Sequence, residues 1–240
     1  MKKATQLLDP RVTEIIPNKL LCPVCKKGKL NLRNEFLSCK NKNCFCEFPL
    51  IDKIPILINE NESIFSIKSF LNREETTISN KRNNKFIKSL YRFLPKIKSH
   101  ISNYKNYAEL SNLLSKKNKS FNVLVIGSGI EGKGLKILKK NKLSNIIYSD
   151  VSYSPNIDLI CDAHDLPFAA SSFDAVICQA VIEHVIDPFK CVEEIFRVLK
   201  LGGYVYAETP FMQQVHMAPY DFTRFTYLGH RRLFRKFEEI

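Results

Sequence analysis

The stretch that decides the fold runs from Phe121 to Gly134 and reads F-N-V-L-V-I-G-S-G-I-E-G-K-G. Its apolar run, Val123–Ile126, is typical of a central parallel strand that is covered on both faces. The run ends in Gly127-Ser128-Gly129, where glycine permits a positive φ and lets a ligand approach the backbone closely. The apolar residues that follow predict a helix over Lys133–Lys140. A strand, a glycine turn and a helix in this order predict a nucleotide-binding crossover.

The glycine turn by itself does not decide which nucleotide is bound. Gly127, Gly129 and Gly132 satisfy the G-x-G-x-x-G pattern of dinucleotide-binding proteins, with Asp150 about twenty residues further on. The sequence after the turn predicts four more strands and one further helix: strands over Asn145–Tyr148, Ile157–Cys161, Phe173–Cys178 and Tyr204–Glu208, and a helix over Pro188–Leu199. Asp150 lies just beyond the second strand, where its carboxylate can accept hydrogen bonds from both hydroxyls of a ribose.

From Val123 to Glu208 the chain resembles the type 11 branch of the class I S-adenosylmethionine-dependent methyltransferases. The matching strings are V-L-V-I-G-S-G, C-D-A-H-D-L-P-F, S-F-D-A-V-I-C-Q-A-V-I-E-H-V and E-I-F-R-V-L-K-L-G-G-Y. The resemblance implies a Rossmann-like, doubly wound, mostly parallel α/β sheet with S-adenosylmethionine over the carboxyl ends of its first strands. The cofactor-binding residues that it implies are Gly127, Ser128, Gly129, Asp150, Asp162, Ala163 and Gln179.

Two positions depart from the family pattern. Val125 stands where the family usually has an acidic residue near the methionine amino group, so that carboxylate is absent or supplied elsewhere. Asp150 and Asp162 are twelve residues apart, too close for a full crossover helix, so we expect a loop or a single turn between them. Asp162 is expected to accept from the adenine amino group, and Asp165, three residues later, to matter much less.

Cysteine spacing is the second strong feature of the sequence. Cys22 and Cys25 are followed by Cys39, Cys44 and Cys46. Cysteine pairs about a dozen residues apart are typical of zinc ribbons, because two knuckle turns direct four thiolates at one tetrahedral ion. Disulfides are the less suitable interpretation for a cytosolic chain. Three other cysteines lie on apolar strand or helix faces and are expected to be small buried residues: Cys161, Cys178 and Cys191.

Residues Leu21–Ile58 resemble the Trm112-like zinc domain, whose pattern is C-P-x-C, L-x-C-x-x-C and Y-P-I-x-D-x-I-P-x-L. The tail of this stretch reads F-P-L-I-D-K-I-P-I-L-I. Counted back from Pro49, Cys44 falls on the family's fourth ligand. The predicted zinc ligands are therefore Cys22, Cys25, Cys39 and Cys44, with Cys46 as the alternative fourth ligand. The alternative hypothesis is that the site no longer binds zinc and that the domain folds through apolar packing alone.

The basic charge of the chain belongs to its first half. Of a net charge of +13, residues 1–120 carry 24 Lys and Arg against 10 Asp and Glu, and residues 121–240 carry 13 against 14. Such asymmetry indicates either contact with nucleic acid or an anionic surface, or a general compositional bias with dispersed lysines. A hydrophobic content of 45% is typical of a globular protein, and no signal peptide or membrane span is recognisable, so we expect a cytoplasmic location.

We expect three regions: a zinc ribbon over residues 1–59, a helical linker or cap over 60–120, and the methyltransferase domain over 121–240. Helices are expected over Ser63–Leu71, Asn84–Leu94 and Ile101–Leu114, either covering the cofactor or packing on the sheet edge. After Glu208 we expect an irregular lid over Thr209–Tyr227, a helix over Leu228–Lys236 and the opening of a sixth strand over Phe237–Ile240. The family sheet has seven strands, so this domain is expected to be truncated after strand five or six.

The resemblance implies methyl transfer, and the acceptor is where the residues leave alternatives open. A small molecule or a glycan ranks narrowly ahead of ribosomal or transfer RNA, because no platform of interleaved aromatic and basic residues is evident. A non-catalytic partner-binding scaffold and a nicotinamide-dependent dehydrogenase are the rival classes. Candidates for a catalytic base are His216 in the lid and the Glu183-His184 pair, which is equally suited to holding the loop after strand four. His100 and His230 are expected at the surface. Nothing in the sequence indicates an oligomeric state.

Overall fold

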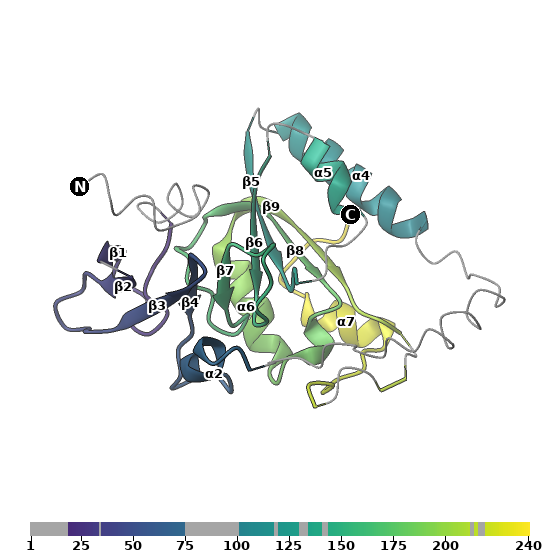
Figure 1. Cartoon of the computed structure of the whole chain (residues 1–240). Helices are drawn as coiled ribbons and strands as arrows, with labels where there is room; N and C mark the ends of the chain where they lie inside the picture. Colours follow the sequence, from purple (N-terminus) through teal and green to yellow (C-terminus); the bar gives the residue numbers. More distant parts are fainter. Residues whose placement is uncertain are drawn as a thin grey trace, which may run out of the picture.

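The computed structural model describes residues 19–33, 35–74, 101–117, 120–129, 134–140, 144–211, 214–215 and 219–240. Among these described residues, nine strands form one sheet in the order β1-β2-β3-β4-β7-β6-β5-β8-β9 (Figure 1). The strands are β1 (Leu30–Arg33), β2 (Phe36–Cys39), β3 (Glu47–Ile51), β4 (Ile54–Leu57), β5 (Phe121–Ile126), β6 (Ser144–Asp150), β7 (Leu159–Cys161), β8 (Phe173–Gln179) and β9 (Leu199–Glu208). The five later strands are parallel to their neighbours, which confirms the Rossmann-like fold class.

Strands β5 to β9 make up the parallel half of the sheet. Strand β5 lies at its centre, because it pairs with β6 on one side and with β8 on the other. Its alternating side chains enter two different cores. Leu124 and Ile126 face a core that includes helix α6 (Pro188–Val198), whereas Val123 and Val125 face a core built with α4 (Ile101–Lys117) and α5 (Leu135–Lys140). The continuous apolar run therefore reflects burial on both faces, as the sequence predicts.

Strands β1 to β4, with the turns between them and the turn before β1, are called the ribbon here. They form an antiparallel meander, and β4 then pairs in parallel with β7. This pairing matches Ile56 with Ile160 and Leu57 with Cys161. Apolar side chains on both sides of the junction belong to one buried cluster, which includes Leu37 and Phe48 from the ribbon. The ribbon is thus continuous with the parallel sheet in both hydrogen bonding and core packing.

The helices begin at recognisable caps. The Asp187 side chain accepts from the Lys190 N–H and Pro188 occupies the first turn, so α6 begins where proline is tolerated and the cap carboxylate satisfies a backbone donor. Thr226 caps α7 (Tyr227–Leu233) and Ser66 caps α2 (Ile67–Leu71) in the same manner. Helices α4 and α5 lie together on one face of the parallel sheet, and α6 and α7 lie on the other (Figure 1).

The structure differs from the sequence-based expectation at the start of one helix and at the last residues of the chain. The helix expected over Ser63–Leu71 begins only at Ile67, because Ser63 and Ser66 make side-chain bonds that favour turns and caps. The sixth strand expected over Phe237–Ile240 is wrong: Phe237 packs its ring on Phe234 and Phe196 instead of extending the sheet.

Two more expectations concern single segments. The stretch between Asp150 and Asp162 holds no helix, as expected, and only the short strand β7. His230 is half-buried beside Phe225 and Phe234, not a surface residue, and burial lowers its pKa. The expected helix over Asn84–Leu94, together with His100, lies outside the described residues.

Candidate cofactor and metal sites

The glycine turn after β5 has the backbone geometry that its sequence requires. Gly127 has a φ of +71°, and a Cβ atom there would lie 2.1 Å from Val181 Cγ2, so both conformation and space demand glycine. The Gly129 N–H donates to Asp150 Oδ2 over 2.7 Å, and a Cβ on Gly129 would lie 3.0 Å from that oxygen. The Ser128 hydroxyl donates to the Ser149 carbonyl over 3.1 Å. The turn and the carboxylate that ends β6 are therefore in direct contact.

Asp150 is held by backbone donors on both oxygens. Besides the bond from Gly129, its Oδ1 accepts from the Ser152 N–H over 2.8 Å. Burial raises the pKa of this carboxyl group, although the backbone hydrogen bonds oppose that rise. A ribose would bring two further donors to the same group, which favours the charged form. The carboxylate thus fits the predicted role in geometry and in chemistry.

Asp162 follows β7, the strand next to β6, and is also buried. Its Oδ1 accepts from the His164 N–H over 2.9 Å and lies 2.6 Å from His164 Nδ1, while the Ser63 hydroxyl donates to Oδ2 over 2.5 Å. The Asp187 N–H donates to His164 Nε2 over 3.0 Å, so the ring carries its proton on Nδ1 and donates it to Asp162. Burial works against ionisation, but the hydrogen bonds from His164 and Ser63 lower the pKa of Asp162.

A polar chain of side chains, most of which the sequence did not single out, lies where β8 and β9 end. Tyr107 of α4 donates to Gln179 Oε1 over 3.1 Å, and Gln179 Nε2 donates to Glu208 Oε2 over 3.0 Å. Tyr206 donates to the same Glu208 oxygen over 2.7 Å. Of these residues only Gln179 was predicted to bind cofactor. Gly134 allows the arrangement, because a Cβ there would lie 2.0 Å from the Tyr107 ring.

The Glu183-His184 pair lies in the 3-10 turn η2 (Ile182–His184) after β8. Glu183 is 1% exposed, and neither of its carboxylate oxygens has a hydrogen-bond partner among the residues that the structure describes. Burial raises its pKa to about 7. His184 Nδ1 lies 2.6 Å from the Tyr220 carbonyl, which leaves Nε2 at 3.7 Å from Glu183 Oε1. His216, the other candidate base, lies outside the described residues.

The structure brings together the four cysteines that were predicted to bind zinc. The Sγ atoms of Cys22, Cys25, Cys39 and Cys44 all lie within 4.8 Å of one another, and Cys46 is not part of this group. The Gly28 N–H lies 3.3 Å from Cys25 Sγ, and the Asn41 N–H lies 3.4 Å from Cys39 Sγ. Four thiols with N–H donors aimed at the sulfurs fit the tetrahedral thiolate set of a structural zinc ion.

Backbone N–H donors lower the pKa of the Cys25 thiol. Burial acts to raise the pKa of Cys25, but the backbone hydrogen bonds of Lys27 and Gly28 bring it down to about 6. A Cβ on Gly28 would lie 2.1 Å from Cys39 Sγ, so glycine is needed for the second knuckle to approach the first. The three remaining cysteines, Cys161, Cys178 and Cys191, are buried, as expected.

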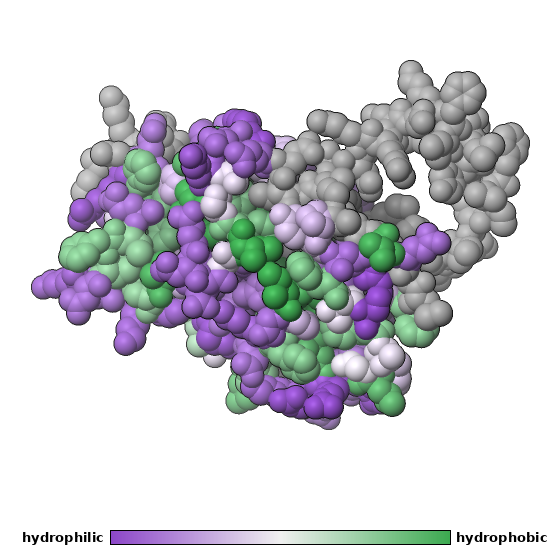
Figure 2. Space-filling view, turned by 90° about the horizontal axis from the view of Figure 1, so that it is seen from below, coloured by the Kyte–Doolittle hydropathy of each residue, from purple (hydrophilic) through white to green (hydrophobic). Residues whose placement is uncertain are grey.

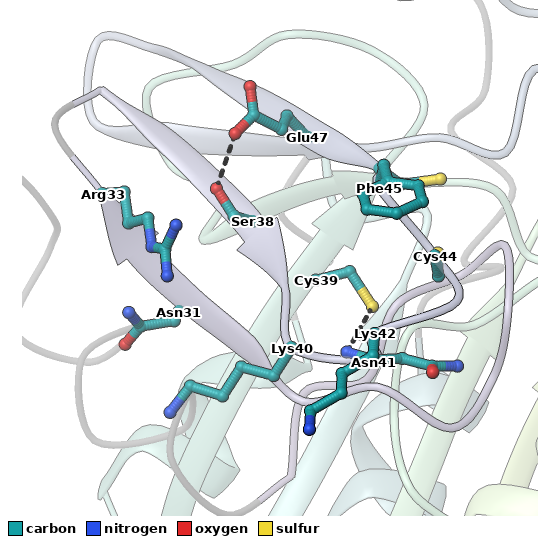
Figure 3. A pocket seen from close by; sticks show the side chains of 11 residues that line it. Asn31, Arg33, Ser38, Cys39, Lys40, Asn41, Lys42, Cys44, Phe45 and Glu47 are labelled. Carbon is teal, nitrogen blue, oxygen red and sulfur yellow. Dashed lines mark hydrogen bonds between the residues drawn. The ribbon is translucent and has the colours of Figure 1, made fainter.

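A hollow of about 550 Å³ lies on the outer side of the ribbon (Figure 3). Arg33, Lys40 and Lys42 border it, and Phe45, which is 90% exposed, stands at its rim. The hollow is also lined by Glu47, whose carboxylate accepts a hydrogen bond from the Ser38 hydroxyl over 2.9 Å. This hollow is lined by residues between Asn31 and Glu47, and its lining includes neither the glycine turn nor Asp150 and Asp162.

Large apolar side chains are exposed in the segments near the carboxyl ends of the parallel strands and at the start of α7: Ile186, Phe189, Phe211, Val215, Phe222, Tyr227 and Leu228. Figure 2 shows apolar and hydrophilic residues interspersed over the face seen from below. Within the described ranges, no helix has the length and apolar character needed to cross a membrane.

Comparison with known proteins finds one matching family model within the parallel half of the chain. Residues 124–207 match the family described as a methyltransferase domain, Methyltransf_11. A demethylmenaquinone methyltransferase of Paenarthrobacter aurescens is 48% identical over 50 residues, covering 20% of each chain. A tRNA U34 carboxymethyltransferase of Campylobacter fetus is 27% identical over 86 residues, covering 36% of this chain and 29% of its own. The chain thus spans less than a third of the length of these curated relatives, and its match to the methyltransferase family is confined to residues 124–207.

Matches among solved structures include the complex between the Haloferax volcanii Trm112 methyltransferase activator and the putative methyltransferase. It matches with 25% identity and a TM-score of 0.42, over 55% of this chain and 68% of the other. A phosphoethanolamine N-methyltransferase of Haemonchus contortus bound to S-adenosyl-L-methionine matches with 19% identity and a TM-score of 0.43, over 55% and 36%.

Proposed function

We propose that this protein transfers a methyl group from S-adenosylmethionine to a small-molecule or glycan acceptor. The observation that carries the proposal is the position of Asp150 and Asp162 at the ends of adjacent parallel strands, beside the glycine turn. Asp150 suits the two ribose hydroxyls, and Asp162 with the Ala163 amide suits the adenine edge. Gly127, Ser128 and Gly129 keep the backbone open for the amino-acid portion of the cofactor.

The sulfonium of the cofactor supplies an already activated methyl group, so the chain mainly aligns the acceptor nucleophile with it. The polar chain of Tyr107, Gln179 and Glu208 lies at the ends of β8 and β9, where a cationic amino group would find a carboxylate. We propose that Glu208 supplies the carboxylate that the resemblance places at the position of Val125. Glu183 is the proposed base, because a carboxyl group with a pKa of about 7 can take a proton near neutral pH.

The apolar surface near the carboxyl end of the sheet favours an acceptor with an apolar portion. The acceptor atom stays open to an oxygen, a nitrogen or a carbon. His216 keeps its predicted role as a substrate-facing residue, to be tested with Glu183 by substitution and a screen of methyl acceptors.

RNA is the second candidate acceptor, and the hollow on the ribbon is the observation that favours it. Arg33, Lys40 and Lys42 can contact phosphates, and the exposed ring of Phe45 can stack on a base. If RNA is the acceptor, methyl transfer to a transcript falls steeply with salt and with Lys40→Glu plus Lys42→Glu, whereas transfer to a small molecule does not.

We further propose that the cysteine cluster holds one structural zinc ion, with Cys22, Cys25, Cys39 and Cys44 as ligands. Calorimetry with S-adenosylhomocysteine tests the cofactor assignment. Binding of that ligand and transfer of a labelled methyl group are expected. Binding of a nicotinamide dinucleotide instead would identify a dehydrogenase, and binding without transfer to any acceptor would favour a partner-binding scaffold.

A further inference from the structure

The loop that carries Asp162 is held by residues from outside residues 124–207, the part that matches the methyltransferase family. Asp165 is 7% exposed and is contacted from two sides. Asn59, which follows β4 and is itself buried, donates to Asp165 Oδ2 over 2.8 Å. Lys26, in the knuckle turn that carries Cys25, forms an ion pair with Asp165 Oδ1. Because a buried carboxylate is costly without partners, these contacts favour one position of the loop.

The same loop is joined to the ribbon through its backbone. The Leu21 N–H donates to the Pro167 carbonyl over 3.0 Å, and the Ala169 N–H donates to the Lys19 carbonyl over 2.8 Å. Strand β4 pairs with β7 immediately before the loop begins. The loop is therefore bounded at its start and its end by the ribbon, and its middle is bonded to Asn59 and Lys26.

Ser63 acts on Asp162 itself. Its hydroxyl donates to Oδ2, the carboxylate oxygen that His164 does not contact. His164 donates twice to Oδ1 and Ser63 donates once to Oδ2, so the plane of the carboxylate is set and Oδ2 keeps a second lone pair for a further donor. Ser63 comes from the segment between β4 and α2, so the orientation of Asp162 depends on a residue about a hundred positions earlier in the chain.

We propose that Ser63, Asn59 and Lys26 are positioning residues of the adenine pocket, so that the ribbon and the segment after it form part of the cofactor site. This inference rests on the proposed function. It assigns to the first half of the chain a role in how tightly and how selectively the adenine ring is bound. Ser63 determines selectivity because it orients the acceptor for the adenine amino group, whereas Lys26 and Asn59 hold the loop in place.

The test is calorimetry on the full-length, zinc-loaded chain with S-adenosylhomocysteine and S-inosylhomocysteine, in which a carbonyl replaces the adenine amino group. The expected result for Ser63→Ala, Asn59→Ala and Lys26→Met is a five- to tenfold weaker affinity for S-adenosylhomocysteine. For Ser63→Ala the preference over S-inosylhomocysteine is also expected to fall at least threefold. Lys27→Met is the matched control for Lys26, because Lys27 is the exposed neighbour in the same turn.

Ser66→Ala is the control for Ser63, because it removes a hydroxyl that caps α2 and does not contact the loop. Thermal unfolding and zinc content check that each variant is folded. Unchanged affinity in all three variants overturns the inference while leaving the proposed function in place. Equal weakening of both ligands by Ser63→Ala overturns the selectivity role. If the unaltered chain binds neither ligand, the proposed function itself has failed.

Discussion

In the ribbon, the four thiols come from the turn before β1, the last residue of β2 and the turn after it, whereas in the parallel sheet one carboxylate ends β6 and the other directly follows β7. Asp150 and Asp162 are placed by the register of β6 and β7, two strands that are hydrogen-bonded to each other. The thiol cluster depends on knuckles that approach each other only because Gly28 leaves room for Cys39. We infer that the carboxylates are preorganised by the sheet and that the thiols need a metal to hold them together.

Because the thiols are expected to need a metal, removing the zinc ligands is predicted to have the largest effect on folding among the substitutions considered below. Cys22→Ser combined with Cys25→Ser is expected to abolish the binding of about one zinc per chain and to unfold the ribbon. Structural zinc contributes on the order of 10 kcal/mol to the folding of small metal domains. Elemental analysis and hydrogen exchange of β1 to β3 measure the two effects. Zinc retained by the double variant, or absent from gently purified protein, would contradict the ribbon assignment.

Removing a carboxylate from the parallel half tests the other side of the comparison. Asp150→Ala is expected to weaken S-adenosylhomocysteine binding about ten- to a hundredfold for each hydrogen bond that the ribose loses, because each such charge-assisted bond contributes about 1.5–3 kcal/mol. Zinc content should stay constant, since Asp150 is bonded to Gly129 and Ser152 and not to the ribbon. Calorimetry measures the affinity, with Glu238→Gln as an exposed control. An unchanged affinity sinks the assignment of Asp150 to the ribose.

Glu183 gives a pH-dependent prediction. Its pKa is about 7 in the folded chain against an ordinary 4.5, so its ionisation destabilises the fold progressively as pH rises from 4.5 to 7. Glu183→Gln is therefore expected to raise the free energy of unfolding by roughly 2–3 kcal/mol at pH 8 and to change it little at pH 4.5.

Urea unfolding of both proteins at the two pH values measures this effect. If Glu183 is also the base, the variant loses methyl transfer at the pH where it gains stability. An equal change in stability at both pH values would show that the carboxyl group does not titrate as the structure indicates.

The smallest effect is expected at the fifth ribbon cysteine. Cys46→Ser should leave the zinc content at about one per chain, because Cys46 is not among the four sulfurs that lie together. Elemental analysis measures it, and Cys44→Ser, which removes one of the four, serves as the comparison. Loss of zinc from Cys46→Ser would show that Cys46 and not Cys44 is the fourth ligand.

Patterns in the sequence predicted those parts of the molecule whose structure depends on residues that are close together along the chain. The unbroken apolar run of β5, the glycines after it and the spacing of the cysteines each reflect what a few consecutive residues need for burial, turning or metal binding. For the same reason the boundaries of α2 and the end of the chain were predicted poorly. Whether Phe237 joins a sheet or packs on Phe196 depends on what lies opposite it.

The sequence by itself predicted a Rossmann-like fold with a segment that resembles methyltransferases, a cluster of four thiols and the two carboxylates beside a glycine turn. Only the tertiary structure decided that the ribbon continues the sheet through β4 and β7, and that Ser63 donates to Asp162. It also showed Asp165, expected to matter little, as a buried anchor for Lys26 and Asn59. These contacts join residues about a hundred positions apart, and they arise from which strand edges pair, a choice that side-chain periodicity does not encode.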